Sequence, residues 1–212
     1  MTVAYRDGAN GSKAKVMLYN GTAWESVGIA GFSAGTVDCI SLSIYNGTPY
    51  VAYMDYANDY KTTVMRYNGT VWETVGSAGF SSRQAVCSLF VYNGTPYVAY
   101  SDTANGYKAT VMKYNGTAWE TVGSAGFSAG EAWGVPSLYV YNGTPYVAYM
   151  DYANGNKATV MKYNGSAWET VGSAGFSAGR AYSTSLFVYN GTPYVAYGDG
   201  ANGCKAMVKK LR

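Results

Sequence analysis

The stretch Thr144–Trp168, TPYVAYMDYANGNKATVMKYNGSAW, decides the fold because it returns along the chain at a nearly constant spacing. Its word Val-Ala-Tyr occurs five times, with copies 47 to 49 residues apart, beginning at Val3, Val51, Val98, Val147 and Val195. Each copy is followed by Asp-x-Ala-Asn and then by a lysine. A tandem repeat with a period of about 40–50 residues and recurrent tryptophan is typical of β-propellers, in which each repeat forms a four-stranded blade.

Each repeat contains four short segments rich in Val, Tyr, Thr and Trp, which predict β-strands A to D. In one repeat these strands are Ser137–Tyr141, Pro145–Met150, Ala158–Tyr163 and Trp168–Val171. Asn-Gly joins A to B and also C to D, and this dipeptide favours a type I′ hairpin, which needs positive φ at both central residues. The Asp-x-Ala-Asn loop joins B to C, and a longer link joins D to the next A.

The pattern predicts 18 strands and one repeat domain over residues 1–212, with full units at 41–75, 88–122 and 137–171 and partial units at 1–28 and 185–212. We therefore predict an all-β propeller with five blades, whose first blade lacks the inner strand and whose last lacks the outer strand. Two alternatives stay open. The last strand A could complete the first unit to give four blades, or terminal half-blades could be exchanged between chains.

Composition narrows the possible partners. Charged residues are 13% of the chain, the formal net charge is +3, and the lysines are spread at about one per repeat, so no nucleic-acid partner is expected. No segment approaches the ~18 apolar residues of a membrane span, and no membrane partner is expected. No signal peptide is visible, which leaves the location open, although a lectin would be extracellular.

Catalytic chemistry has little support in the sequence. The chain has no histidine, which excludes His-based triads and His metal ligands. The three cysteines lack zinc-site spacing and are expected to be free thiols. Carboxylates recur at the same place in every repeat, whereas a catalytic acid–base pair needs two different environments. We therefore predict a protein that is not an enzyme and has no cofactor or metal.

Three words of the repeat, Gly-x-Ala-Gly-Phe-Ser, Ser-Leu-Phe-Val-Tyr and Asn-Gly-Thr-Pro-Tyr-Val-Ala-Tyr, resemble the blade of tachylectin-2-type propeller lectins. The matching positions in one copy are Trp119–Gly123, Gly126–Ser128, Leu138–Tyr141 and Tyr146–Tyr149. The resemblance implies a five-bladed propeller that binds amino sugars in pockets between blades. The chain departs from the lectin blade at Phe127, where that blade has tryptophan, and at the Ala or Val that replaces Asn before the strand-D tryptophan.

The links between strand D and the next strand A vary between repeats, whereas the words on either side hardly change. In a propeller these links lie on one face, and variable loops on a rigid scaffold commonly form binding surfaces, although neutral drift would give the same variation. Trp133 and Tyr182 are the best anchors, since aromatic side chains give large contact area at low entropic cost. The candidate ligand-binding residues in the links are Asp38, Arg83, Gln84, Glu131, Trp133, Arg180 and Tyr182.

The tryptophans at the start of strand D form a second candidate set, Trp24, Trp72, Trp119 and Trp168. Exposed indoles could stack on sugar rings. We favour the alternative that they pack between blades, because every repeat needs that contact. The aspartate of each Asp-x-Ala-Asn loop could similarly hold a metal, but a cap on the turn is the simpler interpretation.

These patterns favour a propeller that binds glycans through repeated, shallow, aromatic-lined sites, each weak alone and stronger through multivalency. The alternative is a structural or self-assembling repeat scaffold, natural or designed, with no small-molecule ligand. A homo-oligomer formed by exchange of terminal half-blades would fit that alternative.

Overall fold

The computed structural model describes residues 1–82 and 87–212, and these residues form 18 strands in five antiparallel sheets. The first sheet contains β1 (Thr2–Asp7), β2 (Lys13–Tyr19) and β3 (Trp24–Ser26). The second contains β4 (Val37–Tyr45), β5 (Thr48–Asp55), β6 (Lys61–Tyr67) and β7 (Trp72–Thr74). The third contains β8 (Cys87–Tyr92), β9 (Thr95–Asp102), β10 (Lys108–Tyr114) and β11 (Trp119–Thr121).

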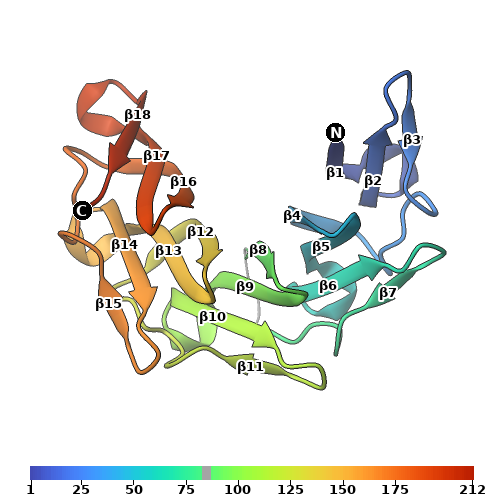
Figure 1. Cartoon of the computed structure of the whole chain (residues 1–212), viewed down its shortest axis with the longest axis horizontal. Helices are drawn as coiled ribbons and strands as arrows, with labels where there is room; N and C mark the ends of the chain where they lie inside the picture. Colours follow the sequence, from blue (N-terminus) through green and yellow to red (C-terminus); the bar gives the residue numbers. More distant parts are fainter. Residues whose placement is uncertain (83–86) are drawn as a thin grey trace.

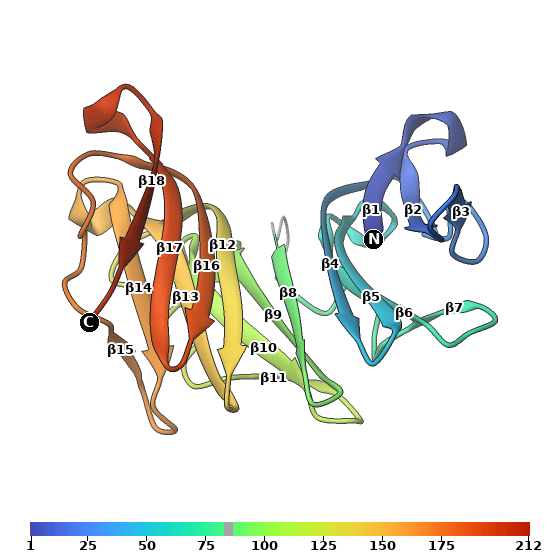
Figure 2. The same cartoon turned by 45° about the horizontal axis from the view of Figure 1, so that its top comes forward.

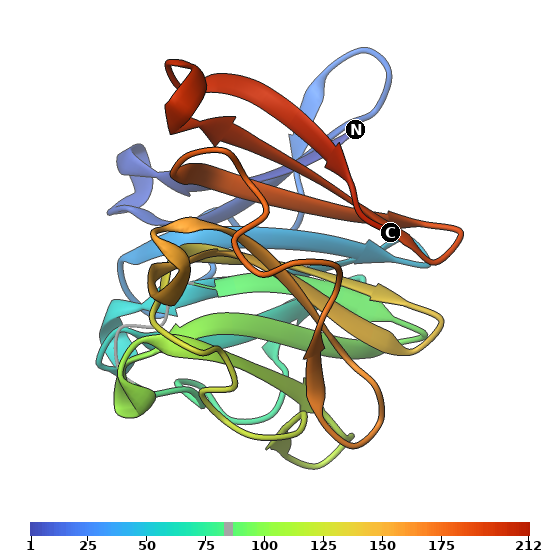
Figure 3. The ribbon, with the colours of Figure 1, turned by 90° about the vertical axis from the view of Figure 1, so that its left-hand side faces the viewer.

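The fourth sheet contains β12 (Ala132–Tyr141), β13 (Thr144–Asp151), β14 (Lys157–Tyr163) and β15 (Trp168–Thr170). The fifth contains β16 (Ala181–Tyr189), β17 (Thr192–Asp199) and β18 (Lys205–Lys210). A short 3-10 helix follows the second strand of each repeat: η1 (Gly8–Asn10), η2 (Tyr56–Asn58), η3 (Thr103–Asn105), η4 (Tyr152–Asn154) and η5 (Gly200–Asn202). These helices gather at one end of the strands, and the A-to-B hairpins lie at the other (Figure 3).

The five sheets stand side by side around an open arc, like the blades of a propeller (Figures 1 and 2). In the three middle sheets the chain runs from the inner strand to the outer strand. The first sheet lacks the inner strand and the fifth lacks the outer one, which confirms the predicted five-bladed arrangement. The four-bladed alternative is not adopted, because β16 pairs with β17 in its own sheet.

The A-to-B hairpins fold as predicted. In each of them both residues of the Asn-Gly turn have positive φ, for example 48° at Asn142 and 78° at Gly143. The prediction for the C-to-D connection is wrong, because only the glycine there has positive φ, 101° at Gly165. Instead the Asn164 side chain accepts hydrogen bonds from the backbone N–H groups of Ser166 and Ala167, both at 2.9 Å. An Asx turn thus closes a longer loop between β14 and β15.

Strand A begins earlier than predicted. In the fourth sheet β12 starts at Ala132 rather than Ser137, and Trp133 pairs with Met150 of β13. A β-bulge separates Trp133 from Ser137 and includes Gly134, whose φ is 77°. The extra residues interrupt the two-residue alternation that identifies a strand in sequence, so the extension was hidden. Trp133 and its counterparts Asp38 and Tyr182 therefore lie on the inner strand, not in a free link.

Hydrophobic cores lie between neighbouring sheets. Between the first and second sheets, Ala14 and Val16 of β2 pack with Val51 and Tyr53 of β5 and with Trp72 of β7. Because a sheet with two apolar faces can bury each face only against another sheet, the junctions carry much of the stability.

The strand-D tryptophans complete these junctions. The indole N–H groups of Trp72, Trp119 and Trp168 donate to a backbone carbonyl of the preceding sheet at 2.8 to 2.9 Å. Each of these indoles also stacks on a phenylalanine of the preceding link, as Trp119 does on Phe80 with ring centroids 4.0 Å apart.

Candidate functional site

The Asp-x-Ala-Asn loops are built by internal hydrogen bonds. The carboxylate of Asp102 accepts from the Ala104 N–H at 3.1 Å, the Asn105 amide at 2.9 Å and the Thr110 hydroxyl at 2.8 Å. Four of the five loop aspartates accept the equivalent backbone N–H, and Asp151 does not. This geometry matches the turn cap favoured from the sequence. Among the described residues no group of three or more His, Cys, Asp or Glu side chains could hold a metal.

An aromatic hollow of about 460 Å³ lies at this loop end of the strands, where residues from the second, third and fourth sheets meet. Its lining residues define what we call the Trp133 pocket: Met54, Tyr56, Tyr60, Ser101, Tyr107, Trp133 and Gly134. Trp133 is 52% exposed and Tyr107 is 48% exposed, whereas large aromatic side chains are usually mostly buried. Large aromatic side chains left open in a concave site are available to a ligand.

The rings form two pairs. Tyr107 and Trp133 lie parallel, with 3° between their planes and 6.3 Å between their centroids. Tyr56 and Tyr60 are tilted by 57°, with centroids 4.6 Å apart. Each tyrosine adds a hydroxyl to its apolar ring, and Ser101 adds one more, so the pocket is mostly apolar with a few polar groups.

Backbone hydrogen bonds hold the loop segments that carry these rings. Tyr60 and Tyr107 both have positive φ, at 62° and 59°, and their N–H groups donate to the carbonyls of Asp55 and Asp102 at 2.9 and 2.8 Å. The carbonyl of Tyr107 accepts from the Ala132 N–H at 2.9 Å and from the Ser101 hydroxyl at 3.0 Å. The loop of the third sheet is thereby tied to the start of β12, directly beside Trp133.

The other candidates from the links are scattered. Asp38 faces Arg6 of the first sheet at 3.8 Å. The Arg180 guanidinium lies over the Tyr182 ring at 5.2 Å. Glu131 contributes its backbone carbonyl to the Tyr152 N–H at 3.1 Å. None of these side chains lines the Trp133 pocket as described.

Arg83 and Gln84 lie outside the described residues. The structure places the indoles of Trp72, Trp119 and Trp168 in the packing between sheets and leaves Trp24 exposed beside Tyr19.

Sequence reasoning identified Trp133 but missed the three tyrosines that complete its pocket. Tyr56 and Tyr60 lie in a loop that the sequence suggests is a simple turn. Tyr107 occupies the position of Tyr60 in the next repeat. Variation between repeats could have pointed to these tyrosines, as it did to the links. The position of Tyr60 is occupied by Ser12, Asn156 and Cys204 in other repeats.

A second hollow, of about 680 Å³, lies at the opposite end of the strands between the second and third sheets. It is polar, and its basic residues Arg66 and Lys113 are paired with Glu73 at 2.5 Å and Glu120 at 3.3 Å. Hydrogen bonds from Arg66 and Asn68 hold the pKa of Glu73 below its usual value. Each basic side chain of the second hollow therefore already has an acidic partner.

No protein-family description matches the sequence, and no curated protein matches it either. Solved structures do share the fold. The lectin SapL1 in complex with α-methyl fucoside matches with a TM-score of 0.63 and 14% identity, over 100% of this chain and 80% of that one. The fucose-specific lectin from Aleuria aurantia matches with a TM-score of 0.59 and 14% identity, over 99% and 77%. An ulvan lyase of family PL25 matches with a TM-score of 0.56 and 14% identity, over 84% and 53%.

At this level of identity the similarities show a shared fold. The resemblance to propeller lectins is thus supported at the level of architecture. Lectins and a lyase are both similar to this chain, so the fold alone does not separate binding from catalysis. Among the described residues, no helix has the length and apolar character needed to cross a membrane.

Proposed function

We propose that this protein binds carbohydrate at the Trp133 pocket and does not react with it. The observation that carries the proposal is the meeting of one tryptophan and three tyrosines from three different sheets in a single open hollow. Sugar rings present a face of C–H groups that stacks on aromatic rings, while their hydroxyls need a few polar partners. The pocket offers both, and its volume suits one or two sugar rings.

The lining favours a sugar with apolar character. Only Ser101 and the tyrosine hydroxyls offer side-chain hydrogen bonds, whereas Met54 and four aromatic rings offer apolar surface. A 6-deoxy sugar, which carries a methyl group in place of a hydroxymethyl group, fits this balance. The two lectins of similar fold are described as fucose-specific and as bound to α-methyl fucoside, which makes a fucoside the first probe.

The proposal places one principal site on the chain, rather than one in every repeat. At the junction that follows, Tyr107 takes the place of Tyr60, Asn156 takes the place of Tyr107, and Tyr182 takes the place of Trp133. Of the two hollows described above, the Trp133 pocket is lined by four aromatic rings and the second hollow by three tyrosines. We therefore propose one principal site in place of the repeated shallow sites expected from the sequence.

Binding is favoured over hydrolysis by the chemistry of the lining. Glycoside hydrolysis generally uses two carboxyl groups on either side of the scissile bond. None of the seven lining residues in the described part of the chain carries a carboxylate, and the sequence has no histidine. Such a pocket can hold a sugar, and its lining lacks the pair of carboxyl groups that glycoside hydrolysis generally uses.

The test is a fluorescence titration with a panel of methyl glycosides, including α-methyl fucoside, methyl galactoside and methyl N-acetylglucosaminide. We expect the tryptophan emission to change with one class of sugar. In Trp133→Ala the affinity should fall by about tenfold or more, corresponding to about 1.4 kcal/mol or more of lost contact. The matched control is Trp24→Ala, which removes another exposed tryptophan far from the pocket and should bind like the wild type.

Calorimetry with the same sugars separates loss of binding from loss of the fluorescent reporter. If no glycoside binds the wild type, or if Trp133→Ala binds as tightly as Trp24→Ala, the proposal is wrong. The structural scaffold would then be the better description, and the exposed faces of the two end sheets give that alternative its own support.

A further inference from the structure

The fifth sheet exposes a face that is buried elsewhere. Val208 of β18 is 70% exposed, whereas its counterparts in the other four repeats, Val16, Val64, Val111 and Val160, are at most 1% exposed. All six residues of β18 are exposed, including Ala206, whose counterparts Ala14, Ala109 and Ala158 are buried. In each of the other repeats these residues are covered by the sheet that follows.

The first sheet exposes the face that, in later repeats, packs against the preceding sheet. Val3 is 37% exposed, whereas its counterparts Val51, Val98, Val147 and Val195 are fully buried. Tyr5 and Trp24 are exposed as well, while Tyr53 and Trp72 at the same places in the second sheet are buried. In the later repeats these residues are covered by the sheet that precedes them.

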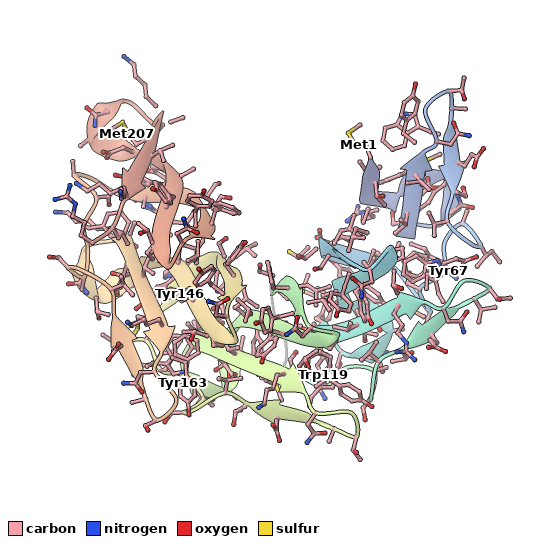
Figure 4. All side chains as sticks on the ribbon, viewed as in Figure 1. Met1, Tyr67, Trp119, Tyr146, Tyr163 and Met207 are labelled. Carbon is pink, nitrogen blue, oxygen red and sulfur yellow. The ribbon has the colours of Figure 1, made fainter. Side chains whose placement is uncertain are left out.

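These two exposed faces are the two halves of one kind of junction. Between the first and second sheets, an alanine and a valine of β2 pack against the valine and tyrosine of β5 and the tryptophan of β7. Ala206 and Val208 repeat the first half of that set, and Val3, Tyr5 and Trp24 repeat the second half. The open arc keeps them apart within one chain, with Met1 and Met207 on opposite sides of the opening (Figures 1 and 4).

We propose that the β18 face of one copy of this chain binds the β1–β3 face of a second copy, head to tail. The contact continues the junction that already joins the sheets within the chain, so the partner is specified by residues present in the protein itself. Burial of these apolar side chains drives the association. The two surfaces are different, which makes the contact heterologous, and copies can add one after another.

Light scattering over a concentration series tests this on the whole chain. We expect the wild-type mass to exceed one chain and to rise with concentration. Val208→Lys blocks the C-terminal face and Val3→Lys blocks the N-terminal face, so each variant alone should have the mass of one chain. Both valines are already exposed within a single chain, and circular dichroism checks that the variants stay folded. Val71→Lys, at an exposed turn residue of the second sheet, is the matched control and should associate like the wild type.

A mixture of the two blocked variants makes the test specific. Val3→Lys keeps its C-terminal face and Val208→Lys keeps its N-terminal face, so an equimolar mixture should form pairs with the mass of two chains. A wild-type mass of one chain at every concentration would overturn the proposal. So would a mixture that stays at the mass of one chain, because a head-to-tail contact requires the pairing.

Discussion

Trp24 in the first sheet and Trp72 in the second occupy the same place in adjacent repeats, yet their surroundings differ. Trp72 is 9% exposed, stacks on Phe32 at 4.0 Å and donates to the Val27 carbonyl at 2.8 Å. Trp24 is 40% exposed and contacts Tyr19 of its own sheet. The same sequence word therefore gives a core residue or a surface residue, depending on whether a neighbouring sheet precedes it.

The comparison teaches that the stability of each sheet depends on its neighbours. A repeat protein is stabilised by the repeat itself and by nearest-neighbour junctions. The second, third and fourth sheets have a junction on each side, whereas the first and fifth have one. Identical substitutions should therefore cost much more in the middle of the arc than at its ends.

The largest difference should come from the tryptophans. We expect Trp72→Ala to lower the free energy of unfolding by about 3–5 kcal/mol, since a large buried ring and its hydrogen bond are lost together. Trp24→Ala should cost less than about 1 kcal/mol, because an exposed side chain has little packing to lose. Urea unfolding at low protein concentration, where association is weakest, measures both values. Equal losses in the two variants would contradict the dependence on neighbouring sheets.

The sequence predicted the sheets well because each strand is part of a word repeated in register. The Val-Ala-Tyr strand, the Asn-Gly hairpin after strand A and the incomplete first and last sheets all follow from local patterns that recur. The C-to-D loop was mispredicted because Asn-Gly there serves an Asx turn, in which the asparagine side chain replaces a backbone partner. The dipeptide alone does not distinguish these two geometries.

The candidate site was less predictable, because its residues are far apart in the sequence. Tyr56, Tyr107 and Trp133 are widely separated along the chain and meet only because three sheets converge at the loop end. A period found in the sequence places residues on equivalent strands but does not show which non-equivalent positions face each other across a junction. The bulge between Trp133 and Ser137 also breaks the two-residue alternation that would identify Trp133 as part of a strand.

A buried threonine provides the second test of the comparison. In the third sheet the Thr110 hydroxyl donates to Asp102 and accepts from the Gly126 N–H, both at 2.8 Å, and Thr63 and Thr159 make the same bonds in neighbouring sheets. We expect Thr110→Val to cost about 1–3 kcal/mol, because the partly buried Gly126 N–H and a carboxylate oxygen of Asp102 each lose a partner. At the same place in the fifth sheet, Met207→Val should change stability by less than about 0.5 kcal/mol, since Met207 is exposed. Thermal unfolding of the two variants gives the comparison, and a loss at Met207 equal to that at Thr110 would refute it.

The smallest effect should appear at Asp7 of the first sheet. Here Lys15 occupies the position of Thr110, and its Nζ lies 3.4 Å from the Asp7 carboxylate. The Asn10 amide donates to Asp7 and is the main cause that holds the pKa of this carboxyl below its usual value, with the Ala9 N–H and Lys15 adding to it. A lowered pKa means that Asp7 adds stability above the carboxyl's unfolded value, about 3.9, and that this stability is lost as the pH falls through the folded value.

We expect Asn10→Ala to raise the pKa of Asp7 more than Lys15→Thr does, because the amide bond is the larger cause. A carboxyl NMR titration of the two variants measures both shifts. Lys15→Thr also gives the first sheet the threonine that the three middle sheets have at this position. The variant therefore tests whether a threonine hydroxyl can cap the loop in a sheet that has no preceding neighbour. A larger shift in Lys15→Thr than in Asn10→Ala would mean that charge pairing, and not the turn cap, controls Asp7 at the end of the arc.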